Sequence, residues 1–132
     1  MNSPVTMWHR IVQTHDSSGL NELLAEDVVF YSPVVHTPQR GKKLTEWYLS
    51  AALDVFVNET FRYVHEIIGP SDAALEFETE IDGVSVNGID LIKWNSESQI
   101  TEFKVMLRPL KAINAVQQRM SATLHPLPRK SQ

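Results

Sequence analysis

The residue best suited to chemistry is Asp90, which stands in the middle of an apolar run at residues 86–94. In a strand, side chains alternate between two faces, so Asp90 shares a face with Ile92 and Trp94. Burial on that face disfavours the charged carboxylate and keeps the acid neutral. A neutral carboxylic acid donates a hydrogen bond to a developing enolate or alkoxide. The alternative is structural, with Asp90 accepting hydrogen bonds that order the sheet.

Two histidines are candidate bases beside such an acid, because histidine exchanges a proton readily near neutral pH. His36 lies in a loop after the first predicted strand, at the expected mouth of the fold; the alternative is a solvated loop residue. His65 shares a strand face with Tyr63 in another predicted strand, so it is a candidate to point inward and pair with Asp90. The alternative for His65 is a hydrogen-bonded residue of the core or of a dimer face.

Aromatic side chains supply the walls expected of a small-molecule site, which is mostly apolar with a few polar anchors. Aromatic residues at helical or strand spacing are equally suited to the core, so both roles stay open. Tyr48 and Tyr63 are the better candidates for polar contacts, because each adds a hydroxyl group. The predicted ligand-binding set is Trp8, Phe30, Tyr48, Phe56, Tyr63, Phe77, Trp94 and Phe103.

The sequence carries no signature of a metal or cofactor site. It has no cysteine, and its five histidines form neither a His-x-His nor a His-Glu-x-x-His pattern. Its five glycines are scattered and form no phosphate-binding loop. We therefore expect chemistry without a metal ion or a cofactor.

Length and charge limit the number of domains and the kinds of partner that the protein can have. The 132 residues fit one domain, predicted at residues 1–124, with a flexible tail at 125–132. The net charge of -4 disfavours a nucleic-acid partner, which selects a basic face. No apolar run approaches the roughly 20 residues of a membrane span, and the N-terminus lacks a signal-peptide pattern. A cytoplasmic protein without a membrane partner is the resulting expectation.

The elements that must position these residues follow from the periodicity of apolar side chains. Helices are predicted at residues 4–15, 20–24, 44–56 and 109–120, and a loop at 34–40. Strands are predicted at residues 28–32, 61–68, 75–81, 84–94 and 100–107, and Asp82-Gly83 is a two-residue hairpin signal. Helices first and a meander of strands afterwards indicate an α+β fold.

Three segments resemble the SnoaL-like, nuclear-transport-factor-2-like superfamily: LLAEDVVFYSPV at 23–34, RGKKLTEWYLSAAL at 40–53 and VNGIDLIKWNSESQITEFKVMLRPL at 86–110. The resemblance implies a cone-shaped, curved antiparallel or mixed sheet wrapped by three to four helices. It also implies a pocket for a small apolar ligand and a homodimer that forms through the sheet.

The same resemblance bears on individual residues. Asp90 aligns with the carboxylic acid of the oxyanion hole in the ketosteroid isomerases of this superfamily. Ser32 stands where those isomerases carry their general base, and a serine cannot do that work without a base beside it. Ser32 is therefore predicted to line the pocket as a hydrogen-bond donor or to form a turn.

Two functions remain open from the sequence. One is a cofactor-independent isomerase, cyclase or hydratase that acts on a largely apolar carbonyl, phenol or epoxide compound. The other is a non-catalytic ligand-binding or dimerisation module. The serine at position 32 argues against the standard ketosteroid isomerase reaction.

Overall fold

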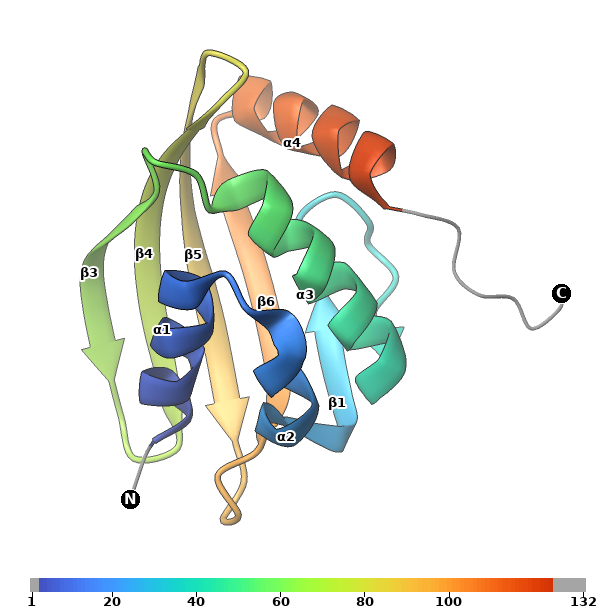
Figure 1. The fold of residues 1–132 in the computed structure, drawn as a ribbon, viewed down its shortest axis with the longest axis vertical. Coiled ribbons are helices and arrows are strands. Elements are labelled where there is room, and N and C mark those ends of the chain that lie inside the picture. Colours follow the sequence, from blue (N-terminus) through green and yellow to red (C-terminus); the bar gives the residue numbers. More distant parts are fainter. Residues whose placement is uncertain (1–2, 125–132) are drawn as a thin grey trace, which may run out of the picture.

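In the computed structural model, which describes residues 3–124, six strands form one curved, open sheet with the helices on its inner side (Figure 1). The strand order is β2-β1-β6-β5-β4-β3. The strand β1 (Leu24–Tyr31) is parallel to β6 (Ile100–Arg108), and the other neighbours are antiparallel. The predicted α+β fold with a curved, mixed sheet is confirmed, and the predicted tail at 125–132 lies outside the described residues.

The long strands form a meander of β3 (Arg62–Ile68), β4 (Asp72–Ile81) and β5 (Val84–Trp94), followed by β6. Between β4 and β5, Asp82 has a φ of 51° and Gly83 a φ of 78°. Two positive φ angles define the type I′ turn, whose twist matches that of the flanking strands. The hairpin predicted at Asp82-Gly83 is therefore confirmed.

The helices lie on one face of the sheet (Figure 1). They are α1 (Pro4–Thr14), α2 (Leu20–Leu23), α3 (Lys42–Phe56) and α4 (Leu110–Thr123). Ser3 caps α1 by accepting a hydrogen bond of 3.1 Å from the backbone N–H of Thr6, which satisfies one of the free donors at a helix start. Among residues 3–124, no helix combines the length and the apolar character needed to cross a membrane.

The first strand differs from the prediction. β1 begins at Leu24, inside the predicted short helix, and its pairing with β6 shifts register between Leu24 and Val29. That irregularity breaks the alternation of side chains between the two faces. The first half of β1 therefore lacks the two-residue apolar pattern that predicts a strand. The segment predicted to be a loop contains a two-residue strand, β2 (Gln39–Arg40). This strand pairs with Phe30 and Val29 of β1.

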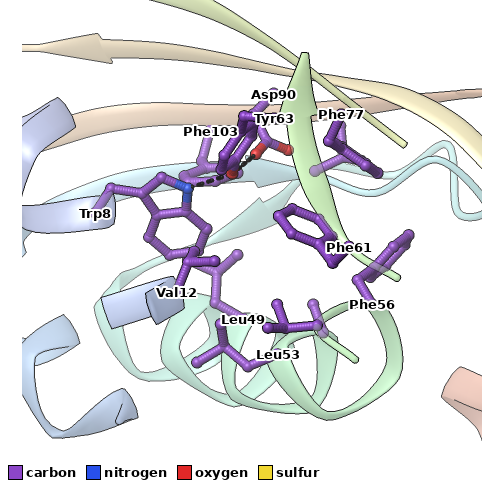
Figure 2. Close-up of a pocket in the computed structure, with 13 residues that line it drawn as sticks. Trp8, Val12, Leu49, Leu53, Phe56, Phe61, Tyr63, Phe77, Asp90 and Phe103 are labelled. Atoms are coloured by element: carbon purple, nitrogen blue, oxygen red, sulfur yellow. Dashed lines mark hydrogen bonds between the residues drawn. The ribbon is translucent and has the colours of Figure 1, made fainter. Parts of the chain in front are cut away.

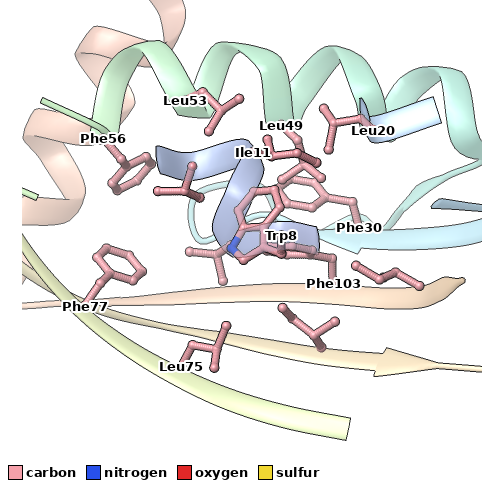
Figure 3. Close-up of a cluster of buried hydrophobic side chains, with 14 of the residues drawn as sticks. Trp8, Ile11, Leu20, Phe30, Leu49, Leu53, Phe56, Leu75, Phe77 and Phe103 are labelled. Carbon is pink, nitrogen blue, oxygen red and sulfur yellow. The ribbon is translucent and has the colours of Figure 1, made fainter. Parts of the chain in front are cut away.

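The core fills the space between the helices and the inner face of the sheet (Figure 3). Phe103 on β6 is at its centre, with 1% exposure and an edge-on contact of 4.9 Å to the ring of Trp8 from α1. Leu20, Leu49 and Leu75 contribute from α2, α3 and β4. Each such side chain stabilises the fold by roughly 1.5–3 kcal/mol through burial. This packing fixes α1 and α3 over the sheet.

Candidate functional site

A cavity lies between α1, the C-terminal half of α3 and the inner face of the sheet (Figure 2). Its cavity volume is about 40 Å³, which is room for a few water molecules and well below the roughly 300–1,000 Å³ of typical small-molecule sites. Six of the predicted site residues line it: Trp8, Phe56, Tyr63, Phe77, Asp90 and Phe103. The wall is apolar apart from a cluster of polar atoms around Asp90.

That cluster is a chain of two hydrogen bonds across three elements (Figure 2). The indole N–H of Trp8 on α1 donates to the hydroxyl oxygen of Tyr63 on β3 at 2.8 Å. The Tyr63 hydroxyl donates to Oδ2 of Asp90 on β5 at 2.7 Å. We call these three residues the Trp8–Tyr63–Asp90 relay. Its members are 55 and 27 residues apart in the sequence, so only the tertiary fold brings them together.

Burial controls the protonation of the relay. Desolvation raises the pKa of Asp90 from its ordinary value of 3.8 to about 7, although the hydrogen bond from Tyr63, and the nearby indole N–H of Trp8, oppose the rise. Burial, and then the charge of Asp90, raise the pKa of Tyr63 well above its ordinary value of 10.0. At neutral pH, Asp90 is therefore divided between acid and carboxylate, whereas Tyr63 keeps its proton.

The second carboxyl oxygen of Asp90, Oδ1, has no side-chain hydrogen-bond partner among the described residues. Among the described residues, the side-chain hydrogen bond to Asp90 goes to Oδ2. In the same part of the chain, Thr45 Oγ1 is the one fully buried side-chain polar atom without a partner. Asp90 is 5% exposed as a whole, and it lines the cavity.

A glycine on β5 makes room for this arrangement. Gly88 and Asp90 both belong to the buried phase of β5, as the alternation of the sequence predicts. Gly88 pairs with Phe77, and a Cβ atom at Gly88 would lie 2.4 Å from Cζ of Phe77. No real Cβ atom tolerates that distance, so any larger residue at position 88 displaces the Phe77 ring. The absence of a side chain there lets Phe77 form the cavity wall beside Asp90.

Three predicted aromatic residues lie outside the cavity wall. Phe30 stacks on Tyr48 with 5.5 Å between ring centres, and Phe30 lies 6.2 Å from Phe103 in the core behind the cavity. Trp94 is half-buried at the end of β5, opposite Ile100. The structure therefore gives these three side chains packing contacts away from Asp90.

The predicted inward orientation of His65 is wrong. The pairing of β3 with β4 shifts register between Tyr63, which faces Phe77, and His65, which faces Glu76. The extra residue, Val64, forms a β-bulge and reverses the faces of the residues after it. His65 is 66% exposed, and its ring nitrogen Nδ1 lies 3.8 Å from a Glu76 carboxylate oxygen on the outer face. The structure does not bring His65 to Asp90.

Ser32 and His36 lie close to each other but away from the cavity. Both line an open groove that also contains Lys104 and Met106. The Ser32 hydroxyl oxygen accepts a hydrogen bond of 3.1 Å from the backbone N–H of Val34, which is the contact of a local turn. Neither residue reaches Asp90, so no predicted base contacts the predicted acid.

Sequence reasoning missed part of the wall and the partner of Tyr63. Val12, Leu49, Leu53 and Phe61 also line the cavity, and nothing separates such residues from core residues in an apolar pattern. Within residues 3–124, Tyr63 and Asp90 are the titratable side chains of the cavity wall. The same residues contain no cluster of three His, Asp or Glu side chains placed to hold a metal ion.

The fold and the cavity together define a class: a curved sheet wrapped around an apolar pocket with one buried acid. The family model for the SnoaL-like domain matches residues 5–103, and the chain belongs to this family. The predicted membership of the nuclear-transport-factor-2-like superfamily is confirmed. The comparison with curated proteins gave no match.

Solved structures agree with this assignment. A steroid delta-isomerase from Pseudomonas aeruginosa is 31% identical, covers 90% of this chain and 87% of its own, and has a TM-score of 0.86. A bacterial protein with a cystatin-like fold from Silicibacter pomeroyi is 32% identical, with 92% and 85% covered and a TM-score of 0.84. An NTF2-like protein of unknown function from Mesorhizobium loti, 21% identical with 80% and 91% covered and a TM-score of 0.69, shares the fold. Family and fold fit a ligand-binding protein.

Proposed function

We propose that the protein binds a small, largely apolar molecule in this cavity and that Asp90 contacts its polar oxygen. The observation that carries the proposal is a buried carboxyl group in an otherwise apolar cavity wall, with Oδ2 bonded to Tyr63 and no side-chain hydrogen bond to Oδ1 among the described residues. When protonated, Asp90 donates a hydrogen bond to a carbonyl, phenolate or epoxide oxygen. Such a bond is strong in a site that excludes water. The cavity volume is about 40 Å³, so a compound of one or two rings must displace side chains of the wall, such as the half-buried Phe61.

A matched pair of compounds tests this binding mode. Indanone and its hydrocarbon parent indane have the same carbon skeleton and differ by one carbonyl group. Calorimetric titration below neutral pH is expected to give indanone about tenfold higher affinity, the value of one hydrogen bond. Asp90→Asn keeps that preference, because its amide group still donates, and Asp90→Leu removes it. Equal affinity of the wild type for the two compounds would overturn the proposal.

A catalytic role is the second candidate. Asp90 titrates near neutral pH, where a single group transfers protons most effectively, and the Pseudomonas relative is named a steroid delta-isomerase. These observations support an isomerisation of a carbonyl compound in which Asp90 is the acid and the base in turn. The absence of a second titratable wall residue beyond Tyr63, within residues 3–124, supports binding without turnover instead.

Hydrogen exchange separates the two candidates without knowledge of the natural substrate. Indanone loses and regains a proton beside its carbonyl group whenever an enol forms. In heavy water, NMR measures the replacement of that proton by deuterium. Catalysis predicts faster exchange with the wild type than with Asp90→Leu. Binding without acceleration of exchange identifies a non-catalytic ligand-binding protein.

We also propose a homodimer through the outer face of the sheet. Apolar side chains gather there, including Ile67 at 62% and Met106 at 46% exposure, around Ile89 and Leu91 of β5. Acidic Glu78 on β4 and basic Arg108 on β6 flank β5 on opposite sides, both in register with Asn87. A two-fold axis along β5 sets β4 of one copy over β6 of the other, so that opposite charges meet.

Light scattering after size exclusion tests the dimer. Met106→Lys is expected to give a monomer, because it places a charge in the apolar contact. Leu110→Lys is the matched control, since Leu110 is 71% exposed on α4 and outside this face. A monomeric wild type, or two variants that behave alike, would contradict the proposed interface.

A further inference from the structure

The donor and acceptor groups of the relay fix which atom donates in each of its two hydrogen bonds. An indole N–H donates and cannot accept, so Trp8 makes the Tyr63 oxygen an acceptor. The hydroxyl group of Tyr63 has a single proton, and its partner at 2.7 Å is Asp90 Oδ2. That proton therefore points to Asp90, and Oδ2 must accept. When Asp90 gains its own proton, the proton has to reside on the other oxygen.

From this geometry, we infer that Trp8 is a positioning residue that, through Tyr63, confines the titrating proton of Asp90 to Oδ1. Oδ1 is the oxygen of this cavity-lining residue that Tyr63 leaves without a hydrogen bond. Its use in ligand contact rests on the proposed function, whereas the proton order rests on the unliganded geometry alone. Trp8 thereby makes neutral Asp90 a donor toward the ligand and leaves it no other arrangement.

The same site without the indole N–H would have two arrangements. Tyr63 could still donate to Oδ2, or it could rotate and accept a proton from Oδ2. In the second arrangement, Oδ1 is a carbonyl oxygen, which cannot donate to a ligand carbonyl group. Each arrangement makes one hydrogen bond, so both would be populated. The single N–H group of Trp8 excludes the second one.

The surroundings hold Trp8 in this role. Its side chain is 5% exposed and packs edge-on against Phe103. One position along α1, His9 pairs with Glu66 of β3 at 2.8 Å and lies against the Tyr63 ring, with 5.1 Å between ring centres. His9 and Glu66 are thus a titratable pair beside the relay, on α1 and β3. The cavity wall from α3 and β6 is apolar.

Infrared spectroscopy of the unliganded protein tests the proton order. The carbonyl stretch of neutral Asp90 is isolated below pH 7 as the difference between the wild type and Asp90→Asn. We expect one band at the lower frequency of a hydrogen-bonded carbonyl, because Oδ2 accepts from Tyr63. Trp8→Phe keeps an aromatic ring but removes the N–H, and we expect it to add a second band at higher frequency. A single unchanged band in Trp8→Phe would overturn the inference.

Two further variants keep the test decisive. Val12→Ala lies on the same helix and lines the same cavity, so it reports loss of packing, and its band is expected to match the wild type. Tyr63→Phe removes the donor outright, so the whole band should move to the higher frequency even if Trp8→Phe fails to fold. The titration midpoint of Asp90 should also rise in both relay variants, since their hydrogen bonds lower its pKa. If the bands behave as expected but indanone does not bind, the proton order stands and the proposed function fails.

Discussion

The two faces of the β4–β5 pair place similar carboxyl groups in opposite surroundings. Asp90 points inward, is 5% exposed and pairs across the strands with Leu75. Glu76 is the next residue after Leu75 and points outward, where it contacts the amide of Asn87 at 2.9 Å and the exposed ring of His65. One register position between two neighbouring strands therefore separates a surface acid from a buried acid. The position, rather than the residue type, creates the candidate site.

The largest contrast between the faces is expected from the loss of buried volume. Phe103→Ala removes a ring that is 1% exposed and should lower the free energy of unfolding by about 3–5 kcal/mol. Met106→Ala on the outer face of the same strand should change it by about 0.5 kcal/mol or less in a monomer. Urea denaturation at low protein concentration measures both. Similar losses for the two variants would contradict the assignment of the faces.

Stability against pH gives the next contrast. The folded state raises the pKa of Asp90 from 3.8 to about 7, so it holds this proton where the unfolded chain has lost it. The stabilisation is complete below the unfolded pKa and is lost as the pH rises through about 7. Relative to Asp90→Asn, the wild type should lose on the order of 4 kcal/mol across that window. Denaturation curves of the wild type and Asp90→Asn at several pH values measure this difference, and the same pH dependence in both would contradict it.

A smaller effect is expected from the relay itself. Tyr63→Phe leaves the Trp8 N–H and Asp90 Oδ2 without their shared partner, at a cost of about 1–3 kcal/mol in unfolding free energy. The cavity should keep its affinity for indane, because its apolar wall is unchanged. Denaturation and calorimetry of the same variant measure the two quantities. A fully stable Tyr63→Phe protein would show that the relay contributes nothing to the fold.

The smallest effect is expected at the outer edge of β3. Arg62 and Glu78 form an ion pair of 2.7 Å, but their side chains are 65% and 43% exposed. Solvent and salt screen such a pair, so Arg62→Ala should cost about 0.2–1 kcal/mol, and less at high salt. Thermal unfolding at low and high ionic strength measures it. A cost comparable to that of Tyr63→Phe would erase the contrast between surface and buried polar contacts.

Sequence reasoning succeeded wherever one local rule dominated. The alternation along β5 predicted that Asp90 lies on the buried face, and Asp82-Gly83 predicted the hairpin. The apolar period predicted a helix that begins at residue 4, which is where α1 begins. Each of these features depends on neighbours in the chain, so its signal is local.

The failures have a common physical origin in contacts between distant residues. Apolar side chains occupy both phases of β3, at Val64, Ile67 and Ile68, so no pattern reveals the bulge that turns His65 outward. The contact of Trp8 with Tyr63 spans 55 residues and leaves no local trace. The cavity wall is likewise indistinguishable from the core in an apolar pattern. Position within a fold decides whether an aromatic ring fills space or borders it.

The bulge at Val64 changes the face of the sheet on which each later residue of β3 lies. Before it, Arg62 lies outside and Tyr63 inside; after it, His65 lies outside and Glu66 inside, opposite the buried Leu75. Consecutive inward residues are therefore three positions apart, which lets one short strand supply both Tyr63 to Asp90 and Glu66 to His9. Deletion of Val64 would restore the regular frame and exchange the faces of every later residue in the strand. The one extra residue therefore leaves Tyr63 at the cavity and places His65 on the outer surface.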